Sequence, residues 1–79
     1  MTRPLYTIAQ EIEADYAAKG KPVHPYAKPY VDAMRYLHTI SDNYGADSAD
    51  MIVRYALSNL STWRGDTARR VKAELKGML

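Results

Sequence analysis

Basic residues recur through the last stretch of the chain, TWRGDTARRVKAELKGML at residues 62–79. Three of them, Arg69, Lys72 and Lys76, are separated by three and four positions, so on a helix they share one face. Cations arranged in this way can neutralise a row of phosphates, which makes the stretch a candidate nucleic-acid surface. This candidate basic surface consists of Arg64, Arg69, Arg70, Lys72 and Lys76.

The alternative interpretation is a helix face that contacts only water. We favour it because most charged helix faces are solvated and because the helix dipole stabilises cations near a helix C-terminus. On this interpretation Arg70 pairs with Glu74 one turn further along. A helix-turn-helix DNA reader fits poorly, since Arg64 stands where an apolar residue should anchor the turn and Glu74 stands at a normally apolar position. We therefore expect no direct readout of bases.

A second group of candidate residues is aromatic and lies in and after a proline-rich connector. The chain has seven Tyr and one Trp but no Phe, and Tyr suits half-buried positions and interfaces. Because Tyr and Arg commonly anchor protein interfaces, the candidate partner-binding residues are Tyr26, Tyr36 and Arg35. Tyr30 and Met34 are four positions apart and are expected to belong to the core.

No pattern in the sequence predicts catalysis or a cofactor. His24 and His38 are far apart and lack a second histidine one helical turn away, so we expect neither to bind a metal. The segment DNYGADSAD (residues 42–50) is similar to a calcium loop, but Tyr44 stands where a ligand oxygen is needed. We interpret it as a junction between helices. The expectation is a protein without enzymatic activity, metal or cofactor.

The elements that position these residues are predicted to be helices throughout. Apolar residues recur at steps of three and four, and the predicted helices span residues 4–19, 29–43, 47–63 and 66–78. Thr2 and Asp47 are predicted to cap the first and third helices, Asp66 or Thr67 the fourth, and Gly45 is predicted to adopt a left-handed conformation. The fold class is all-α, a compact bundle of three to four helices in one domain spanning residues 1–79. The third helix should be central and carry four residues into the core: Ile52, Ala56, Leu60 and Trp63.

Composition sets the remaining limits. A chain of 79 residues without cysteine forms one core and no disulfide, and its longest apolar runs are too short for a membrane span. The N-terminus lacks the pattern of a signal peptide, so we expect a cytoplasmic protein. Net charge is only +2, but the N-terminal end is acidic and the C-terminal end is basic. A two-fold pair could set those ends against each other, which makes a homodimer possible.

Four segments give a family resemblance: IAQEI, PYVDAM, YGADSADMIVRYALSN and TWRGDTARRVKAEL. Together they resemble a group of short actinobacteriophage (mycobacteriophage-type) proteins of unknown function. The resemblance covers most of the chain and implies a small phage accessory protein acting in the cytoplasm of the host cell. It carries over no catalytic residues, but compact phage accessory proteins often bind and redirect a host protein. The leading expectation is therefore a non-catalytic module that binds a host or phage protein, and the alternative is a nucleic-acid-binding module that uses the basic C-terminal helix.

Overall fold

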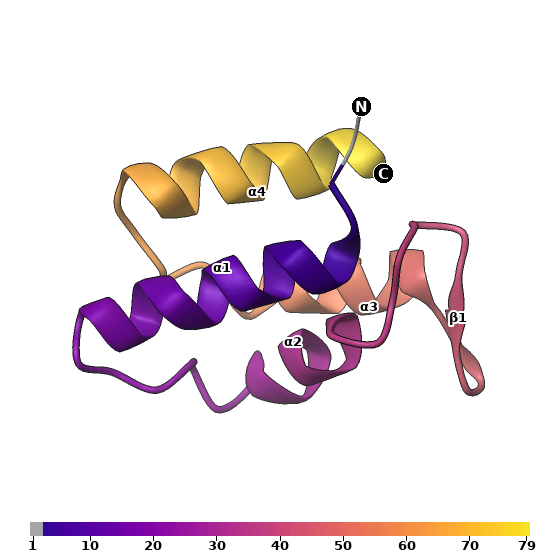
Figure 1. The fold of residues 1–79 in the computed structure, drawn as a ribbon, viewed down its shortest axis with the longest axis horizontal. Coiled ribbons are helices and arrows are strands. Elements are labelled where there is room, and N and C mark those ends of the chain that lie inside the picture. The colour runs from indigo at the N-terminus through magenta and orange to yellow at the C-terminus, as the bar shows by residue number, and fades with distance from the viewer. Residues whose placement is uncertain (1–2) are drawn as a thin grey trace.

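Four helices and one short hairpin make up residues 3–79, the part of the chain that the computed structural model describes. The helices are α1 (Leu5–Ala18), α2 (Lys28–Met34), α3 (Ala49–Ser58) and α4 (Asp66–Met78). Between α2 and α3, the strands β1 (Asn43–Tyr44) and β2 (Asp47–Ser48) pair antiparallel. Figure 1 shows α4 along one side of α1 and α2 on the other, with the hairpin at one end. The predicted all-α bundle is confirmed.

The core is built from the apolar stripes that the sequence pattern predicts. Helix α1 buries five residues at steps of three and four, and α4 buries three at steps of three and four: Leu5, Ile8, Ala9, Ile12 and Tyr16, and Ala68, Val71 and Leu75. Helix α3 contacts both α2 and α4, and its Ile52 and Ala56 are buried as expected. Leu60 and Trp63 are also buried, although both lie beyond the end of α3.

The second helix is shorter than predicted, because α2 ends at Met34 and not at residue 43. The predicted cap of α1, Thr2, lies outside the described residues, and Pro4 precedes the helix without a side-chain cap. The first amides of α1 instead donate to the chain that follows α2: Leu5 N–H to the carbonyl of His38 and Tyr6 N–H to that of Leu37, both at 2.9 Å. A continued α2 would use those carbonyls in its own helix, so capping α1 requires α2 to end early.

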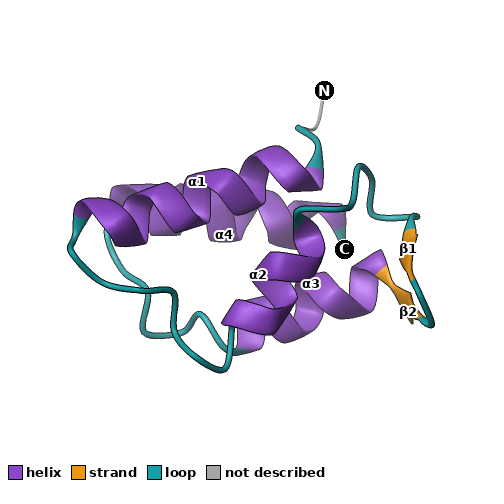
Figure 2. Cartoon of the chain, turned by 60° about the horizontal axis from the view of Figure 1, so that its bottom comes forward, coloured by secondary structure: helices purple, strands orange, loops and turns teal. Residues whose placement is uncertain are grey.

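The third helix was predicted over residues 47–63 but spans only Ala49–Ser58. At its start, the segment interpreted as a simple junction forms the β1–β2 hairpin, in which Asn43 faces Ser48 and Tyr44 faces Asp47. Gly45 has a positive φ, 60°, as predicted, but it stands in the turn between β1 and β2 and not at the end of a helix. Figure 2 shows the two strands side by side. A positive φ at the first of two central residues matches a type II′ turn. The prediction that Asp47 caps α3 is therefore wrong, since Asp47 is part of β2.

At its other end, α3 stops where short polar side chains compete for the helix backbone. The Ser58 hydroxyl donates to the carbonyl of Arg54 at 3.1 Å, and the Asn59 side chain donates to that of Tyr55 at 2.9 Å. Such bonds offer the backbone an alternative to further helix. The chain then turns, and Leu60 and Trp63 enter the core from this turn. Helix α4 has the predicted bounds, but Gly65 and not Asp66 or Thr67 precedes it as the cap residue.

Ion pairs join α1 to α4 across the bundle. Arg3 donates to both carboxylate oxygens of Glu74, at 3.1 and 2.7 Å, and also lies 2.7 Å from Glu11. Glu11 in turn pairs with Arg70. The predicted pair between Arg70 and Glu74 is therefore wrong: Arg70 pairs with Glu11 of α1, and Glu74 pairs with Arg3, which lies just before α1.

No helix within residues 3–79 combines the length and the apolar character needed to cross a membrane.

Candidate functional site

Most exposed aromatic side chains of the described residues lie on or beside α2, the hairpin and α3. We call Tyr26, Tyr30, Tyr36, Tyr44 and Tyr55 the tyrosine surface. Tyr30 and Tyr55 place their ring centroids 5.4 Å apart, joining α2 to α3, and Tyr36 and Tyr44 place theirs 6.0 Å apart, joining the end of α2 to the hairpin. Met51 on α3 is also exposed. Large apolar groups in solvent on neighbouring elements are typical of a surface that binds another molecule.

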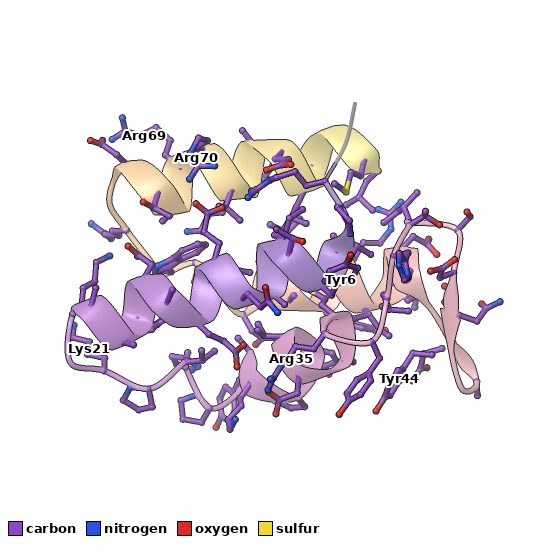
Figure 3. The ribbon with its side chains drawn as sticks, viewed as in Figure 1. Tyr6, Lys21, Arg35, Tyr44, Arg69 and Arg70 are labelled. Atoms are coloured by element: carbon purple, nitrogen blue, oxygen red, sulfur yellow. The ribbon has the colours of Figure 1, made fainter. Side chains whose placement is uncertain are left out.

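The three predicted partner-binding residues lie at the two ends of α2. Tyr26 precedes the helix and is 72% exposed, and Tyr36 follows it and is 76% exposed. Arg35 is exposed beside Tyr36, and its Nε lies 3.6 Å from Glu13 of α1. Figure 3 shows Arg35 and Tyr44 along the same lower side of the molecule. The predicted residues thus lie before and after α2 and are exposed there. As predicted, Met34 is buried, and Tyr30 is partly buried against the core.

Sequence reasoning missed Tyr44, Met51 and Tyr55. The interpretation of residues 42–50 as a junction between helices gives Tyr44 no role in a binding surface. The sequence does hold a sign of the hairpin, since a glycine at the first central position of a two-residue turn favours a type II′ connection. Met51 and Tyr55 belong to the predicted third helix but to neither its predicted core residues nor the predicted binding residues, and they are 41% and 47% exposed. Nothing local in the sequence distinguishes a half-exposed tyrosine from a buried one.

The charges around the tyrosine surface are balanced. Lys28 lies 3.3 Å from Asp32 within α2, and Arg54 lies 3.8 Å from Asp50 within α3. Each pair is four residues apart on an exposed helix face, a spacing that stabilises a helix only slightly. The surface therefore presents aromatic rings among neutralised charges, which is the composition of many protein interfaces.

The structure divides the predicted basic surface in two. Arg70 turns towards α1 and pairs with Glu11, an interaction that lowers the pKa of that carboxyl below its ordinary 4.5. The Lys72 ammonium donates to the carbonyl of Trp63 at 2.5 Å, and burial, together with Lys76 and Arg64, lowers its pKa. Arg64, Arg69 and Lys76 remain exposed. Arg69 has an 82% exposed side chain and only a distant contact, 3.8 Å, with the fully exposed Asp66.

Two lysines of the α1 end, absent from the predicted set, lie near these arginines. A hollow of about 290 Å³ is lined by residues that include Trp63, Arg64, Arg69 and Lys72. A second hollow of about 230 Å³ shares Trp63 and Arg64 and adds Lys19 and Lys21. Sequence reasoning missed Lys19 and Lys21 because they are more than forty positions from Arg64, so only the fold brings them together.

The Asp15 carboxylate fixes the position of Trp63, which lines both hollows. Asp15 accepts the Trp63 indole N–H at 2.7 Å and pairs with Lys19 at 2.9 Å, and both contacts, the one to Lys19 foremost, lower its pKa. Lys19 also donates to the Arg64 carbonyl at 2.6 Å. These bonds fix the turn around Trp63 to α1.

Within the described residues, no three His, Asp or Glu side chains gather as metal ligands would. The imidazole of His24 accepts the Tyr26 amide at 3.2 Å, and His38 packs edge-on against Tyr6 with 4.9 Å between the rings. Both histidines thus have local structural contacts.

The chain matches no protein-family model, and neither the curated proteins nor the solved structures include a significant match to it.

Proposed function

We propose that this protein is a non-catalytic accessory module that binds another protein through the tyrosine surface. The observation that carries the proposal is the pair of tyrosine contacts, Tyr30–Tyr55 and Tyr36–Tyr44. Three of these rings, Tyr36, Tyr44 and Tyr55, are exposed to solvent. Tyr has few rotatable bonds and both apolar and polar atoms, so it contributes contact area at low entropic cost.

The partner proposed is a protein of the bacterial host, met in the host cytoplasm. This part rests on the resemblance to small actinobacteriophage proteins. The balanced charge of the tyrosine surface supports a partner recognised by shape and aromatic contact rather than by a strong field.

The test is affinity capture from a host lysate, with and without nuclease treatment, and the captured proteins are identified by mass spectrometry. The wild-type chain should retain a protein partner, and Tyr36→Ala combined with Tyr44→Ala should lose it. Arg69→Ala is the control, because Arg69 is at least as exposed but belongs to α4. Circular dichroism should show that all three proteins are equally helical.

Capture of the same partner by the Tyr36/Tyr44 variant would show that the binding site lies elsewhere on the molecule. Recovery of nucleic acid alone, lost on nuclease treatment, would reject protein binding as the function. Light scattering of the isolated protein across a concentration series tests whether a second copy of the chain is the partner. A mass that doubles with concentration, and does not double in the Tyr36/Tyr44 variant, would identify the tyrosine surface as a homodimer interface.

A further inference from the structure

The turn that joins α3 to α4 is surrounded by cations from both ends of the chain. We call the two hollows on either side of it the Trp63 notch. Its lining cations are Lys19, Lys21, Arg64, Arg69 and Lys72. Figure 3 shows Lys21, at the end of α1, and Arg69, at the start of α4, at the same end of the molecule.

Few acids neutralise these cations. Across residues 3–79, Lys21, Arg64, Lys72 and Lys76 form no ion pair. The acids nearby are Asp15, which already holds Lys19 and the Trp63 indole, and Asp66, which is fully exposed at 3.8 Å from Arg69. Burial, and after it repulsion by Lys76 and Arg64, lowers the pKa of Lys72, so these three cations share one local field. A field of one sign in a hollow attracts an anion.

The donors of the notch are held in place before any ligand arrives. Lys19 and Lys72 each give one N–H to a carbonyl of the turn, at 2.6 and 2.5 Å, and an ammonium has three N–H groups. Lys72 therefore keeps two N–H groups for a ligand, whereas Lys19, which also pairs with Asp15, keeps one. Helix α4 begins at this turn without a side-chain cap, which adds the positive end of its dipole to the same hollow.

The form of the notch favours phosphates in a row over bases or lipids. The two hollows share Arg64, so anions on both sides of it can be contacted at once. Trp63 is 3% exposed and offers no ring for a base to stack on, and none of the exposed large apolar side chains lines either hollow. Proteins that bind single strands use exposed aromatic rings, and proteins that enter a bilayer surface use exposed apolar side chains.

We propose that the Trp63 notch binds the phosphodiester backbone of duplex nucleic acid without reading its sequence. Arg64 contacts the backbone centrally, and Lys21, Arg69 and Lys72, which line the two hollows with it, contact flanking phosphates. Arg70, which pairs with Glu11, takes no part. This surface is separate from the tyrosine surface, so it adds a second binding activity to the proposed function.

The test is fluorescence anisotropy with a short labelled DNA duplex of mixed sequence and the full chain. With about four phosphates neutralised, affinity should fall by about two decades between roughly 50 and 200 mM salt. Arg64→Ala combined with Arg69→Ala should reduce the slope of log affinity against log salt by about two. The lysine versions, Arg64→Lys with Arg69→Lys, should restore it.

The matched control removes the same charge elsewhere: Lys28→Ala combined with Arg54→Ala, on α2 and α3. It should leave the salt slope unchanged. Equal loss in the two alanine variants, or an affinity that does not respond to salt, would overturn the proposal. So would equally tight binding of single-stranded DNA of the same length, or of anionic phospholipid vesicles at the same charge concentration.

Discussion

The α1–α4 pair and the α2–hairpin–α3 region use their polar surfaces in different ways. Between α1 and α4, charged groups join residues far apart in the sequence: Arg3 with Glu74, Glu11 with Arg70, and Asp15 with the Trp63 indole. In α2 and α3, the pairs Lys28–Asp32 and Asp50–Arg54 each stay within one helix. The contact of Arg35 with Glu13, at 3.6 Å, is a looser bond between α2 and α1.

The comparison distinguishes polar groups that hold the fold together through long-range contacts from groups that remain available to a binding partner. The α1–α4 ion pairs bind the molecule to itself, and they already set the acidic end of the chain against its basic end. A second copy is therefore not needed to satisfy that charge asymmetry. In the other region, the exposed rings of Tyr36 and Tyr44 contact each other, so we expect that they can bind another protein without loss of the fold.

The largest expected loss of stability comes from the turn between α3 and α4, which connects the two regions. Leu60 is fully buried in the turn between α3 and α4. Leu60→Ala leaves a cavity there and should lower the free energy of unfolding by about 2–5 kcal/mol. Urea denaturation measures it, with Met51→Ala at an exposed position of α3 as the control. A variant as stable as wild type would show that the turn contributes nothing to the core.

The next largest loss of stability is expected from an ion pair between α1 and α4, compared with an ion pair within α2. Glu11→Gln removes the carboxylate that lies between Arg3 and Arg70, and because these side chains are partly exposed the loss should be only about 1 kcal/mol. Asp32→Asn breaks a pair within α2 and should cost less, about 0.3–0.5 kcal/mol. If the two substitutions cost the same in urea denaturation, the ion pairs of the two regions do not differ as proposed.

Acid should weaken the same pair of helices. Hydrogen bonds from Arg70 to Glu11, from Arg3 to Glu74 and from Lys19 to Asp15 lower the pKa of each carboxyl in the folded state. The folded state therefore binds fewer protons than the unfolded state. The stability that results is fully present above the ordinary Glu value of 4.5 and is lost as the pH falls through the lowered pKa values.

Denaturation midpoints measured from neutral pH downwards should show this loss, and Glu11→Gln should make it shallower. The opposite dependence, with stability rising as the pH falls, would mean that these carboxylates are not paired in solution.

Only a small effect on stability is expected from the exposed tyrosines. Tyr36→Ala combined with Tyr44→Ala removes one exposed aromatic contact and should change the free energy of unfolding by no more than about 1 kcal/mol. Tyr16→Ala is the contrast, because Tyr16 is buried against Trp63 and its loss should cost about 3 kcal/mol or more. A large loss from the exposed pair would make these tyrosines part of the fold rather than a binding surface.

The sequence predicts the α1–α4 pair better than the other two helices, for physical reasons. Proline and glycine lie at the ends of α1 and glycine lies before α4, so local preferences decide where these helices begin and end. The end of α2 depends on hydrogen bonds to α1, because the first amides of α1, about thirty positions earlier, need the carbonyl groups that follow α2. No local sequence pattern shows these long-range hydrogen bonds, so the helix predicted over residues 29–43 extends beyond the observed end of α2 at Met34.

The candidate surfaces follow the same rule. Tyr26 and Tyr36 are exposed, and for Tyr26 the prolines around it leave no helix to bury it, but that they bind a partner stays a prediction. The pairing of Arg70 with Glu11 and the approach of Lys19 and Lys21 to Arg64 both depend on how α1 lies against α4. A sequence pattern gives the spacing of charges along one helix but not their partners across the bundle.

The backbone bonds from Leu5 and Tyr6 to the carbonyls of His38 and Leu37 tie the first turn of α1 to the residues next to Tyr36. Amide hydrogen exchange at Leu5 and Tyr6 therefore reports how often residues 37–38 detach, and not merely how a free helix end frays. A protein that holds Tyr36 should restrain residues 37–38 and slow exchange at both amides. The beginning of α1 would then act as a built-in probe of an event at the tyrosine surface, readable without any label placed on that surface.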